Sequence, residues 1–325
     1  MDEKKLVELV GTAREEISSQ LARNVVGQEK VIERIMLALF CQGHCLLEGV
    51  PGLAKTMLVR SLGAALDLRF GRIQFTPDLM PSDIIGSELI EENQEGKREF
   101  RFHKGPLFAN LVLADEINRT PPKTQSALLE AMQEHAVTVN GVNYPMEKPF
   151  LVLATQNPIE QEGTYPLPEA QLDRFLFYLK MSYPSQSEEE EVVRRMTSRG
   201  ESALTPVLDA GKIMAIQQMI YHVPVADEIV AYAVRVARST RPHNCAAGSQ
   251  TAKMVEFGVS PRAVQWLVLA AKALSLVRGR TAPGYDEIKE LIPDVFRHRI
   301  VLNFQAEAEG VSTDDILTSL IDEVK

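Results

Sequence analysis

The stretch "GVPGLAKT", residues 49–56, differs by one letter from the phosphate-binding loop pattern G-x-x-x-x-G-K-[ST]. Gly49, Lys55 and Thr56 fit the pattern, and Ala54 occupies the position of its second glycine. In such a loop, backbone N–H groups and the start of the next helix face the phosphates. The lysine reaches the β- and γ-phosphates, and the threonine hydroxyl binds Mg²⁺. Taken alone, the stretch is equally compatible with a Gly-Pro turn that binds nothing.

The alanine in this loop raises a question about backbone conformation. Gly49 and Gly52 can supply the turn itself, where φ is positive or another segment comes close. We expect Ala54 to lie at the start of the following helix with a negative φ, where alanine meets no steric penalty and is the best helix former. A positive φ at Ala54 would contradict this interpretation.

Short apolar segments on both sides of the loop predict a parallel β-sheet. The run "LVLA" within residues 109–116 is apolar without alternation, which is typical of a strand buried on both faces. Strands are predicted within residues 44–49, 68–75, 109–116, 149–157 and 175–180, and helices at 6–21, 29–40 and 55–66. Strands that alternate with helices indicate an α/β fold with crossover helices.

Two further segments read as β-hairpins that a parallel sheet does not need. One runs from Ser87 to Phe102 and is expected to turn around residues 93–96. The other runs from Ala136 to Met146 and contains Asn140-Gly141, a strong hairpin signal. Both hairpins are interpreted as insertions.

The character of the sequence changes after Ser185. Four glutamates, Glu188–Glu191, are expected to open a helix as a solvated first turn, since acidic residues favour helix starts. Further helices are predicted at Leu208–Met219, Ala226–Ser239 and Pro261–Val277, and no strand is predicted. We therefore expect an α/β domain at 1–184 and a small helical domain at 185–325.

The strand segment "LVLADE" ends in two adjacent carboxylates, Asp115 and Glu116. Two carboxylates at the tip of a buried strand are costly unless they are used or paired. Asp115 can hold the Mg²⁺ shell, and Glu116 can orient and deprotonate a water for attack on the γ-phosphate. The alternative, a helix N-cap, explains Asp115 but not the phosphate loop upstream.

The segment "ATQNP" places Asn157 at the end of the next strand. Its amide could position the attacking water between Glu116 and the γ-phosphate. The alternative is a turn asparagine before Pro158, which is common in any protein.

These motifs together resemble those of an AAA+ ATPase, and more narrowly of the MoxR family, over nearly the whole chain. The similar segments are "NVVGQE" (24–29), "GVPGLAKT" (49–56), "LADEINR" (113–119), "ATQNP" (154–158), "LPEAQLDRF" (167–175), "GVSPRA" (258–263) and "PDVFRHRI" (293–300). The resemblance implies a P-loop three-layer sandwich with a parallel sheet, followed by an all-helical lid. It also implies the clade with an insertion in helix 2, and the two predicted hairpins suit that clade.

The resemblance implies ATP and Mg²⁺ as cofactors. Residues 24–29 would lie near adenine, and Thr56 and Asp115 would hold the metal. The implied catalytic residues are Glu116 as base, Asn157 as sensor 1 and Arg174 as arginine finger. The implied nucleotide-binding residues are Val26, Gly27, Gly49, Val50, Pro51, Gly52, Leu53, Ala54, Lys55, Thr56, Met57, Asp115 and, as sensor 2, Arg262.

The roles of the arginines can also be interpreted from the residues around them, without the family resemblance. Arg174 could pair locally with Asp173 or Glu169. Arg262 follows Ser260-Pro261, an N-cap and N1 pair, so it lies in a first helical turn where the dipole disfavours cations. An anionic partner such as a γ-phosphate is therefore expected, with a solvated surface arginine as the alternative. Arg119 is a further candidate for contact with a neighbouring subunit.

Composition restricts the class of protein. A net charge of -9 and a pI near 5.3 argue against a duplex-DNA binder with a basic face. Three cysteines suit a reducing compartment, and Cys41 and Cys45 are interpreted as buried small hydrophobes rather than metal ligands with His44. We find no signal-peptide pattern and no apolar run long enough for a membrane span, and expect a cytoplasmic protein.

The sequence therefore predicts a Mg-ATP-dependent ring motor, hexameric by resemblance, that remodels protein clients and is often paired with von Willebrand factor A domain proteins. Two alternatives remain open. One is a DNA-acting or chelatase-like motor, since relatives with such functions share the insertions. The other is a nucleotide switch in which ATP only sets the assembly state.

Overall fold

The computed structural model describes residues 3–92, 98–158, 163–198, 202–245 and 249–324. Its centre is a five-stranded sheet in the order β2-β5-β8-β1-β9, in which every neighbouring pair is parallel. The strands are β1 (Cys45–Glu48), β2 (Phe70–Gln74), β5 (Leu111–Asp115), β8 (Leu151–Gln156) and β9 (Phe177–Lys180). The predicted parallel α/β sheet is confirmed, and each strand lies within the segment expected for it.

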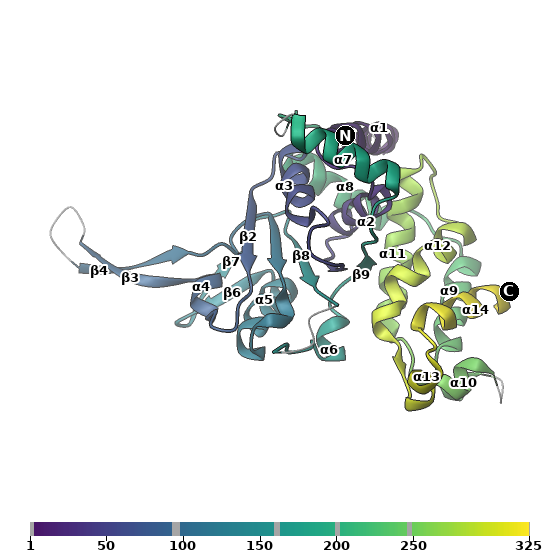
Figure 1. Cartoon of the computed structure of the whole chain (residues 1–325). Coiled ribbons are helices and arrows are strands. Elements are labelled where there is room, and N and C mark those ends of the chain that lie inside the picture. The colour runs from purple at the N-terminus through teal and green to yellow at the C-terminus, as the bar shows by residue number, and fades with distance from the viewer. Residues whose placement is uncertain (1–2, 93–97, 159–162, 199–201, 246–248, 325) are drawn as a thin grey trace.

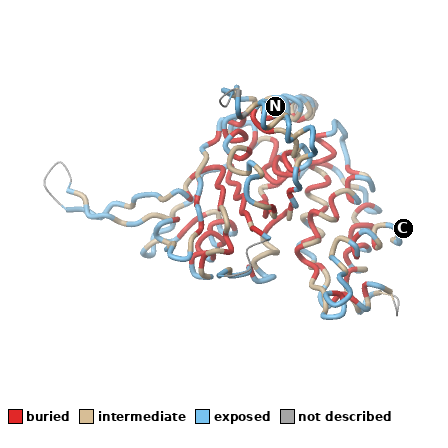
Figure 2. The backbone as a smooth tube through the Cα atoms, in the orientation of Figure 1, coloured by how far each residue is buried: buried red, intermediate tan, exposed pale blue. Residues whose placement is uncertain are grey.

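Alternate residues of the central strands enter two separate hydrophobic cores. Leu113 and Leu153 belong to one core, whereas Val112 and Val152 belong to the other. The first core includes helices α1 (Glu3–Leu21), α2 (Glu29–Phe40) and α3 (Lys55–Ala65), and the second includes α5 (Pro122–Glu134). Because successive side chains of a strand point to opposite faces, helices cover both faces of the sheet. Figures 1 and 2 show these three layers, with buried strands in the middle.

Both predicted hairpins are present. Strands β3 (Gly86–Glu92) and β4 (Arg98–Lys104) form an exposed arm that extends away from the body of the molecule (Figures 1 and 2). The turn expected at residues 93–96 lies outside the described residues. Strands β6 (Ala136–Val139) and β7 (Val142–Pro145) form the second hairpin, and Asn140 and Gly141 have φ values of 48° and 82°. Two positive φ angles in a two-residue loop are typical of a type I′ turn.

The chain after Ser185 is mainly helical. Its larger helices are α7 (Gln186–Ser198), α8 (Ala210–His222), α9 (Asp227–Ser239), α11 (Pro261–Val277), α12 (Tyr285–Phe296) and α14 (Thr313–Glu323). Two short helices, α10 (Gln250–Met254) and α13 (Phe304–Glu309), and a two-stranded sheet of β10 (Val255–Phe257) and β11 (Val301–Leu302) accompany them. That sheet was not predicted, because strands of two or three residues are too short to show a periodic pattern. Earlier in the chain, the short helix α4 (Pro81–Ile85) precedes β3, and the short helix α6 (Glu169–Leu172) precedes β9.

A buried arginine holds the lid helix α12 against α2. The side chain of Arg34 in α2 is fully buried and donates hydrogen bonds to Asp294 at 3.0 Å and to Glu290 at 2.7 Å. The guanidinium stays charged, since these carboxylates raise its pKa against the effect of burial. Removing one partner of such a pair would leave an uncompensated buried charge, so these contacts fix where the lid docks.

The cysteines lie where small hydrophobic residues are expected. Cys41 and Cys45 are buried in the first core, and Cys245 is partly exposed. His44, between the first two, uses both ring nitrogens for hydrogen bonds, to the Met132 carbonyl at 3.2 Å and to the Val152 N–H at 3.0 Å. Within the described part of the chain, no helix is both long enough and apolar enough to cross a membrane.

Candidate active site

Three strands of the sheet end beside the predicted phosphate-binding loop. Gly49, the first loop residue, donates its backbone N–H to the Gln156 carbonyl at 3.3 Å, which places Asn157 directly beside the loop. Strand β5, which ends at Asp115, pairs in register with β8 on the other side. The loop, Asp115-Glu116 and Asn157 therefore meet at the carboxyl edge of the sheet. Parallel α/β proteins bind ligands at this edge.

The loop uses its glycines for two different reasons. A Cβ on Gly49 would lie 2.9 Å from the Cβ of Met181, which is closer than carbon atoms approach. Gly52 has a φ of +89°, a conformation that favours glycine. Lys55 begins helix α3, and its ammonium donates a hydrogen bond back to the Gly49 carbonyl. The first residue of the loop therefore binds the side chain of the lysine at the end of the loop.

Ala54 does not have the backbone conformation predicted for it. It is the N-cap of α3 with φ 54° and ψ 25°, in the left-handed region, so the expectation of a negative φ is wrong. This left-handed residue is the one that joins the loop to the helix. A left-handed alanine costs about 1 kcal/mol because its Cβ approaches the following carbonyl oxygen. The alanine is therefore a strained substitute for glycine, not a neutral one.

Partial burial lowers the pKa of Lys55 below its usual value. The carboxylates of Asp115 and Glu116 oppose this effect and favour the charged ammonium. A lysine that is half withdrawn from water and faces two carboxylates is well prepared for an anionic ligand. Phosphate oxygens would supply further negative charge beside it.

The hydroxyl of Thr155 connects the two predicted acidic residues. It donates a hydrogen bond to Asp115 Oδ1 at 2.7 Å and accepts one from the Glu116 backbone N–H at 2.8 Å. Glu116 itself has φ 59°, a left-handed conformation that is uncommon for glutamate. Strained backbone of this kind persists only where the surroundings enforce it, and it clusters at functional sites.

Sequence reasoning missed the polar residues of β2 that face these carboxylates. Arg72 donates to Asp115 Oδ2 at 2.7 Å, and Gln74 donates to Glu116 Oε2 at 2.7 Å. Arg119, predicted as a possible subunit contact, bonds Glu116 Oε2 within the same chain at 2.9 Å. The signal for Arg72 and Gln74 is their i, i+2 spacing on a strand, but it becomes informative only once β2 is known to lie beside β5.

A pocket of about 360 Å³ opens beside the loop. The predicted residues that line it are Val26, Pro51, Gly52, Leu53, Ala54 and Met57. Asn24, Val25 and Gln28, from the segment expected near adenine, line it as well. The residues that the sequence did not predict are Tyr183, Pro184, Glu189, Val192, Val193 and Arg195. Gly27 lies under α7, since a Cβ there would meet Glu188 Oε1 at 2.8 Å. Helix α7 therefore covers a mainly apolar pocket suited to a flat ring.

Arg174 and Arg262 lie at the side of the sheet where the parallel strands begin, whereas the loop lies at the side where the strands end. Arg174 precedes β9, whose first residue pairs with the first residue of β1, whereas the loop follows the last residue of β1. Arg174 is half-buried and donates to the Leu129 carbonyl at 2.9 Å. Arg262, in the first turn of α11, lies 3.7 Å from the carboxylate of Asp173. Neither arginine lines the pocket beside the loop.

The donor set at the carboxyl edge fits a magnesium nucleotide. Thr56 and Asp115 offer oxygen atoms, the ligands that Mg²⁺ prefers. Within the described ranges, no group of three or more His, Cys, Asp or Glu side chains could form a metal cage. A phosphate-bound Mg²⁺ needs no such cage, since it takes one or two protein ligands together with phosphates and water.

Comparison with known proteins gives the same picture. Residues 44–177 match the ATPase family associated with various cellular activities (AAA), and residues 248–320 match the AAA lid domain. The chain is 45% identical over 305 residues to Chaperone MoxR1 of Mycobacterium tuberculosis, covering 94% of this chain and 80% of that protein. It is 43% identical to YeaC of Bacillus subtilis, covering 98% and 94%. Protein MoxR of Methylorubrum extorquens is 30% identical, covering 87% and 86%.

A solved structure extends this similarity to three dimensions. A crystal structure from Cytophaga hutchinsonii, described as that of a candidate ATPase, superposes with a TM-score of 0.91 at 41% sequence identity. The match covers 99% of this chain and 97% of that one, so the sheet and the lid are both shared.

Proposed function

The chain belongs to the MoxR family of AAA ATPases, and on this premise we propose that it is a Mg-ATP-dependent motor. It would hydrolyse ATP at the interfaces between subunits of a ring and use the energy to remodel protein clients. One observation carries this proposal. The candidate phosphate site lies where the strands of the sheet end, and the two candidate transition-state arginines lie where the strands begin.

Each chain contributes most of a nucleotide site at the carboxyl edge. The pocket under α7 would take adenine, and the backbone from Gly49 to Lys55 would surround the phosphates. Thr56 and Asp115 would hold Mg²⁺, which neutralises charge on the phosphates. Glu116 would take a proton from the attacking water, and Asn157, beside the loop, would hold that water in line.

The two arginines would complete the site of a neighbouring subunit. Strand β1 has four residues, so its first and last Cα atoms are about 10 Å apart at 3.3 Å per residue. Arg174 and Arg262 are therefore far from their own loop but close to one another, since Asp173 precedes the first and contacts the second. A head-to-tail interface that closes into a ring would bring this edge of one chain to the loop of the next. Arginines supplied in this way can raise turnover by about 10³- to 10⁵-fold.

The remaining parts of the proposal concern the assembly and its surroundings. We favour a hexameric ring, protein clients and a possible partner with a von Willebrand factor A domain, in line with the family. The name of the Mycobacterium relative, a chaperone, supports the protein client. Three cysteines without a disulfide support a reducing, cytoplasmic compartment.

The decisive experiment compares two variants of the site. Lys55→Ala should lose nucleotide binding, and Glu116→Gln should bind ATP but hydrolyse it at a small fraction of the wild-type rate. The Glu116→Gln protein with ATP then serves as a trap, and the proteins it retains identify the client. Normal turnover by Glu116→Gln would refute the assignment of the base.

Dependence on protein concentration tests the ring. If neighbouring subunits complete each site, turnover per subunit should rise with protein concentration until assembly is complete. Turnover per subunit that stays constant through the range in which rings assemble would contradict completion by a neighbour. Strong stimulation by DNA that disappears with salt would instead favour the DNA-acting alternative.

A further inference from the structure

Arg299 binds the backbone on both sides of Arg174. It lies in a 3₁₀ turn, Arg297–Arg299, directly after lid helix α12, and its side chain is only 2% exposed. Its Nη2 donates to the Asp173 carbonyl at 3.0 Å and to the Phe175 carbonyl at 2.6 Å. A residue of the lid therefore determines the path of the chain at the residues immediately before and after Arg174.

The same guanidinium also holds the side chain of Asp173. Arg299 Nε donates to Asp173 Oδ1 at 2.6 Å. The other carboxylate oxygen, Oδ2, lies 3.7 Å from Arg262 Nη1, and Ser260 of the Arg262 turn donates to Oδ1 at 3.5 Å. Asp173 thus joins Arg299 to the first turn of α11. Both candidate transition-state arginines are one contact away from Arg299.

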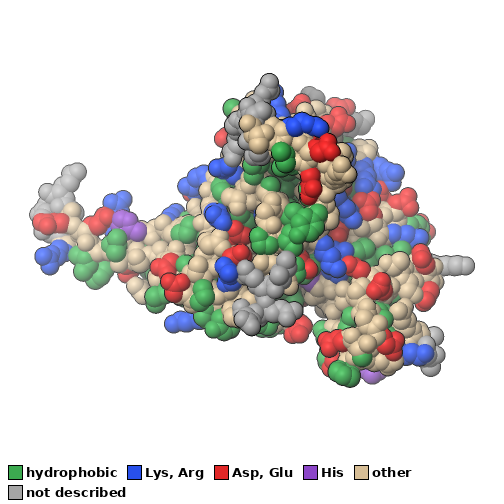
Figure 3. Space-filling model, in the orientation of Figure 1, with side chains coloured by type: hydrophobic (Ala, Val, Ile, Leu, Met, Phe, Trp, Pro, Cys, Tyr) green, Lys and Arg blue, Asp and Glu red, His purple; other side chains and the backbone are tan. Residues whose placement is uncertain are grey.

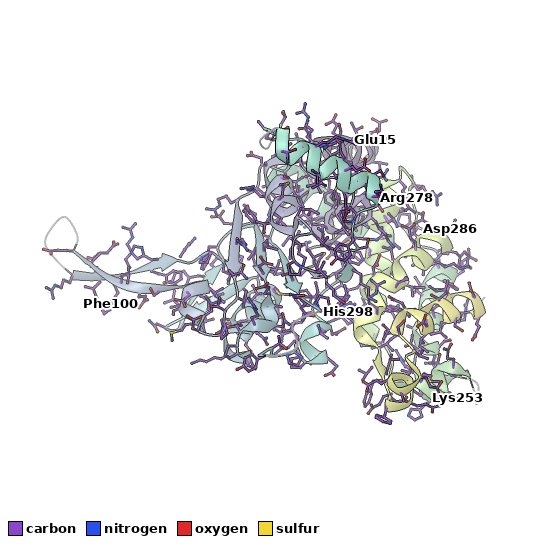
Figure 4. All side chains as sticks on the ribbon, viewed as in Figure 1. Glu15, Phe100, Lys253, Arg278, Asp286 and His298 are labelled. Atoms are coloured by element: carbon purple, nitrogen blue, oxygen red, sulfur yellow. The ribbon has the colours of Figure 1, made fainter. Side chains whose placement is uncertain are left out.

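The charge of Arg299 persists despite its burial. Withdrawal from water lowers its pKa to about 10, while Asp173 acts in the opposite direction. At neutral pH the guanidinium is therefore a cation whose charge Asp173 compensates. The neighbouring His298 adds a contact between its Nε2 and the Phe175 carbonyl at 3.1 Å. Figure 4 labels His298 where the lid meets the sheet.

The lid has a docking contact besides those of Arg299. Arg34 already bonds α12 to α2 on another side. Arg299 donates to one carbonyl of the preceding helix α12, that of Val295. The other carbonyls that it binds, those of Asp173, Phe175 and Leu176, belong to the short segment that carries Arg174. A planar guanidinium with fixed donor directions can bind several carbonyls at once better than an ammonium can. Arg299 is therefore placed to control geometry at Arg174.

We propose that Arg299 is a positioning residue that presents Arg174 and Arg262 as one preformed pair to the nucleotide of the neighbouring subunit. It fixes Arg174 through the backbone on either side and Arg262 through Asp173. The inference rests on the proposed function, since it requires that the two arginines act on a neighbour. The inference assigns a role to the stretch "FRHR", residues 296–299, for which the sequence alone predicted none.

The test uses Arg299→Lys, which keeps the positive charge and most of the volume but loses the fork. ATP affinity and KM for ATP should stay within about twofold of wild type, because each subunit's own nucleotide pocket is intact. The value of kcat should fall by about 10- to 100-fold, as expected for a catalytic group displaced by about 1 Å. Wild-type kcat, or loss of nucleotide binding by the variant, would overturn the inference.

Mixed rings separate a role toward the neighbour from a role within the subunit. Glu116→Gln subunits lack the base but keep Arg299, whereas Arg299→Lys subunits keep the base. In an equal mixture, about a quarter of head-to-tail interfaces would join an intact base to a correctly held arginine pair. Activity should therefore recover to about a quarter of wild type, although either variant alone is nearly inactive. Absence of recovery would show that Arg299 acts on its own subunit's site.

Two controls complete the design. Arg34→Lys alters an equally buried arginine that docks the lid without touching Asp173, so its kcat should stay near wild type. A fall in kcat equal to that of Arg299→Lys would attribute the effect to lid docking and overturn the inference. Arg174→Ala mixed with Glu116→Gln tests the underlying proposal. If activity recovers in the Arg174→Ala mixture but not in the Arg299→Lys mixture, only the positioning role of Arg299 is refuted. If activity recovers in neither mixture, completion of the site by the neighbouring subunit is refuted, and the positioning role is refuted with it.

Discussion

The Thr155 hydroxyl donates a hydrogen bond to the Asp115 carboxylate at 2.7 Å and so ties the end of β8 to the end of β5. Thr155 is fully buried and also accepts the Glu116 backbone N–H. One hydroxyl therefore fixes a candidate metal ligand and the backbone of the candidate base. Partners of this kind orient the groups that bind metal, although they do not contact it.

Replacing this hydroxyl should reduce turnover more than nucleotide binding. Thr155→Val keeps the shape but leaves the Glu116 N–H without its acceptor, and partners of metal ligands typically contribute about 10- to 100-fold to affinity or activity. We expect kcat to fall within that range and the Mg²⁺ concentration for half-maximal activity to rise. Steady-state kinetics over a Mg²⁺ titration provide the measurement. Thr155→Ser keeps the hydroxyl and should stay near wild type; equal behaviour of the two variants would disprove the role.

The strained loop residue makes a prediction about stability. Since Ala54 has a φ of 54°, Ala54→Gly should raise the free energy of unfolding by about 1 kcal/mol. ATP affinity should be kept, because the loop path does not change. Ala64→Gly is the matched control, an exposed alanine inside the same helix α3. It should lower stability by about 0.5–1 kcal/mol, and the same sign for both variants would contradict the assigned backbone conformation.

The sequence predicted features that depend on local chemistry. Lys55, Asp115, Glu116 and Asn157 could be named as candidates because each motif is a contiguous segment with a residue type that its proposed task requires. The strands were found because buried parallel strands are short apolar runs. Such patterns are complete within ten residues, so no knowledge of the sheet order is needed.

Features that depend on which strands and turns become neighbours were not predicted. Gln74 reaches Glu116 only because β2 lies beside β5 in the sheet. Arg299 reaches Asp173 across 126 positions of the chain. The φ of Ala54 is set by how the loop joins β1 to α3, which overrides the preference of alanine for the right-handed region. These outcomes are set by tertiary structure and have no local sequence signal.

A buried histidine should make stability depend on pH. Burial lowers the pKa of His44 from 6.5 to about 4, and the nearby ring of His135 acts in the same direction. The folded state thus holds His44 neutral, while the unfolded chain binds a proton below about pH 6.5. The free energy of unfolding should be unaffected above that pH and should decline as the pH falls from 6.5 towards 4. At pH 5.5 the loss from this residue is about 1.4 kcal/mol.

The measurement compares denaturant unfolding at pH 7.5 and pH 5.5 for the wild type and His44→Gln. A glutamine amide can also donate to the Met132 carbonyl and accept from the Val152 N–H, but it does not titrate. The variant should therefore lose less stability on acidification than the wild type does. His298, whose pKa is also lowered by burial, accounts for part of what remains. Identical pH dependence of the two proteins would exclude His44 as a source.

On the proposed function, we expect a protein client to contact the arm. Ile90 and Phe100 are directly opposite each other on β3 and β4 and are 61% and 73% exposed, which is unusual for an apolar cross-strand pair. Figure 3 shows hydrophobic side chains along the arm, and Figure 4 labels Phe100 there. At the base of the arm, the ring of Phe102 packs against that of Tyr144 of the second hairpin, with ring centroids 4.2 Å apart and the planes tilted by 30°. The two hairpins are thus packed together, so movement of one would carry the other.

Replacing the exposed pair should separate client binding from catalysis. We expect Ile90→Ser with Phe100→Ser to leave basal ATP turnover unchanged, because the pair lies far out on the arm and contacts no part of the nucleotide site. The same double change in the Glu116→Gln trap should abolish client retention. Leu89→Ser is the matched control: Leu89 is 49% exposed but faces the opposite side of the ribbon, since successive strand residues alternate. Retention by the double variant, or equal loss with Leu89→Ser, would show that this face is not the contact surface.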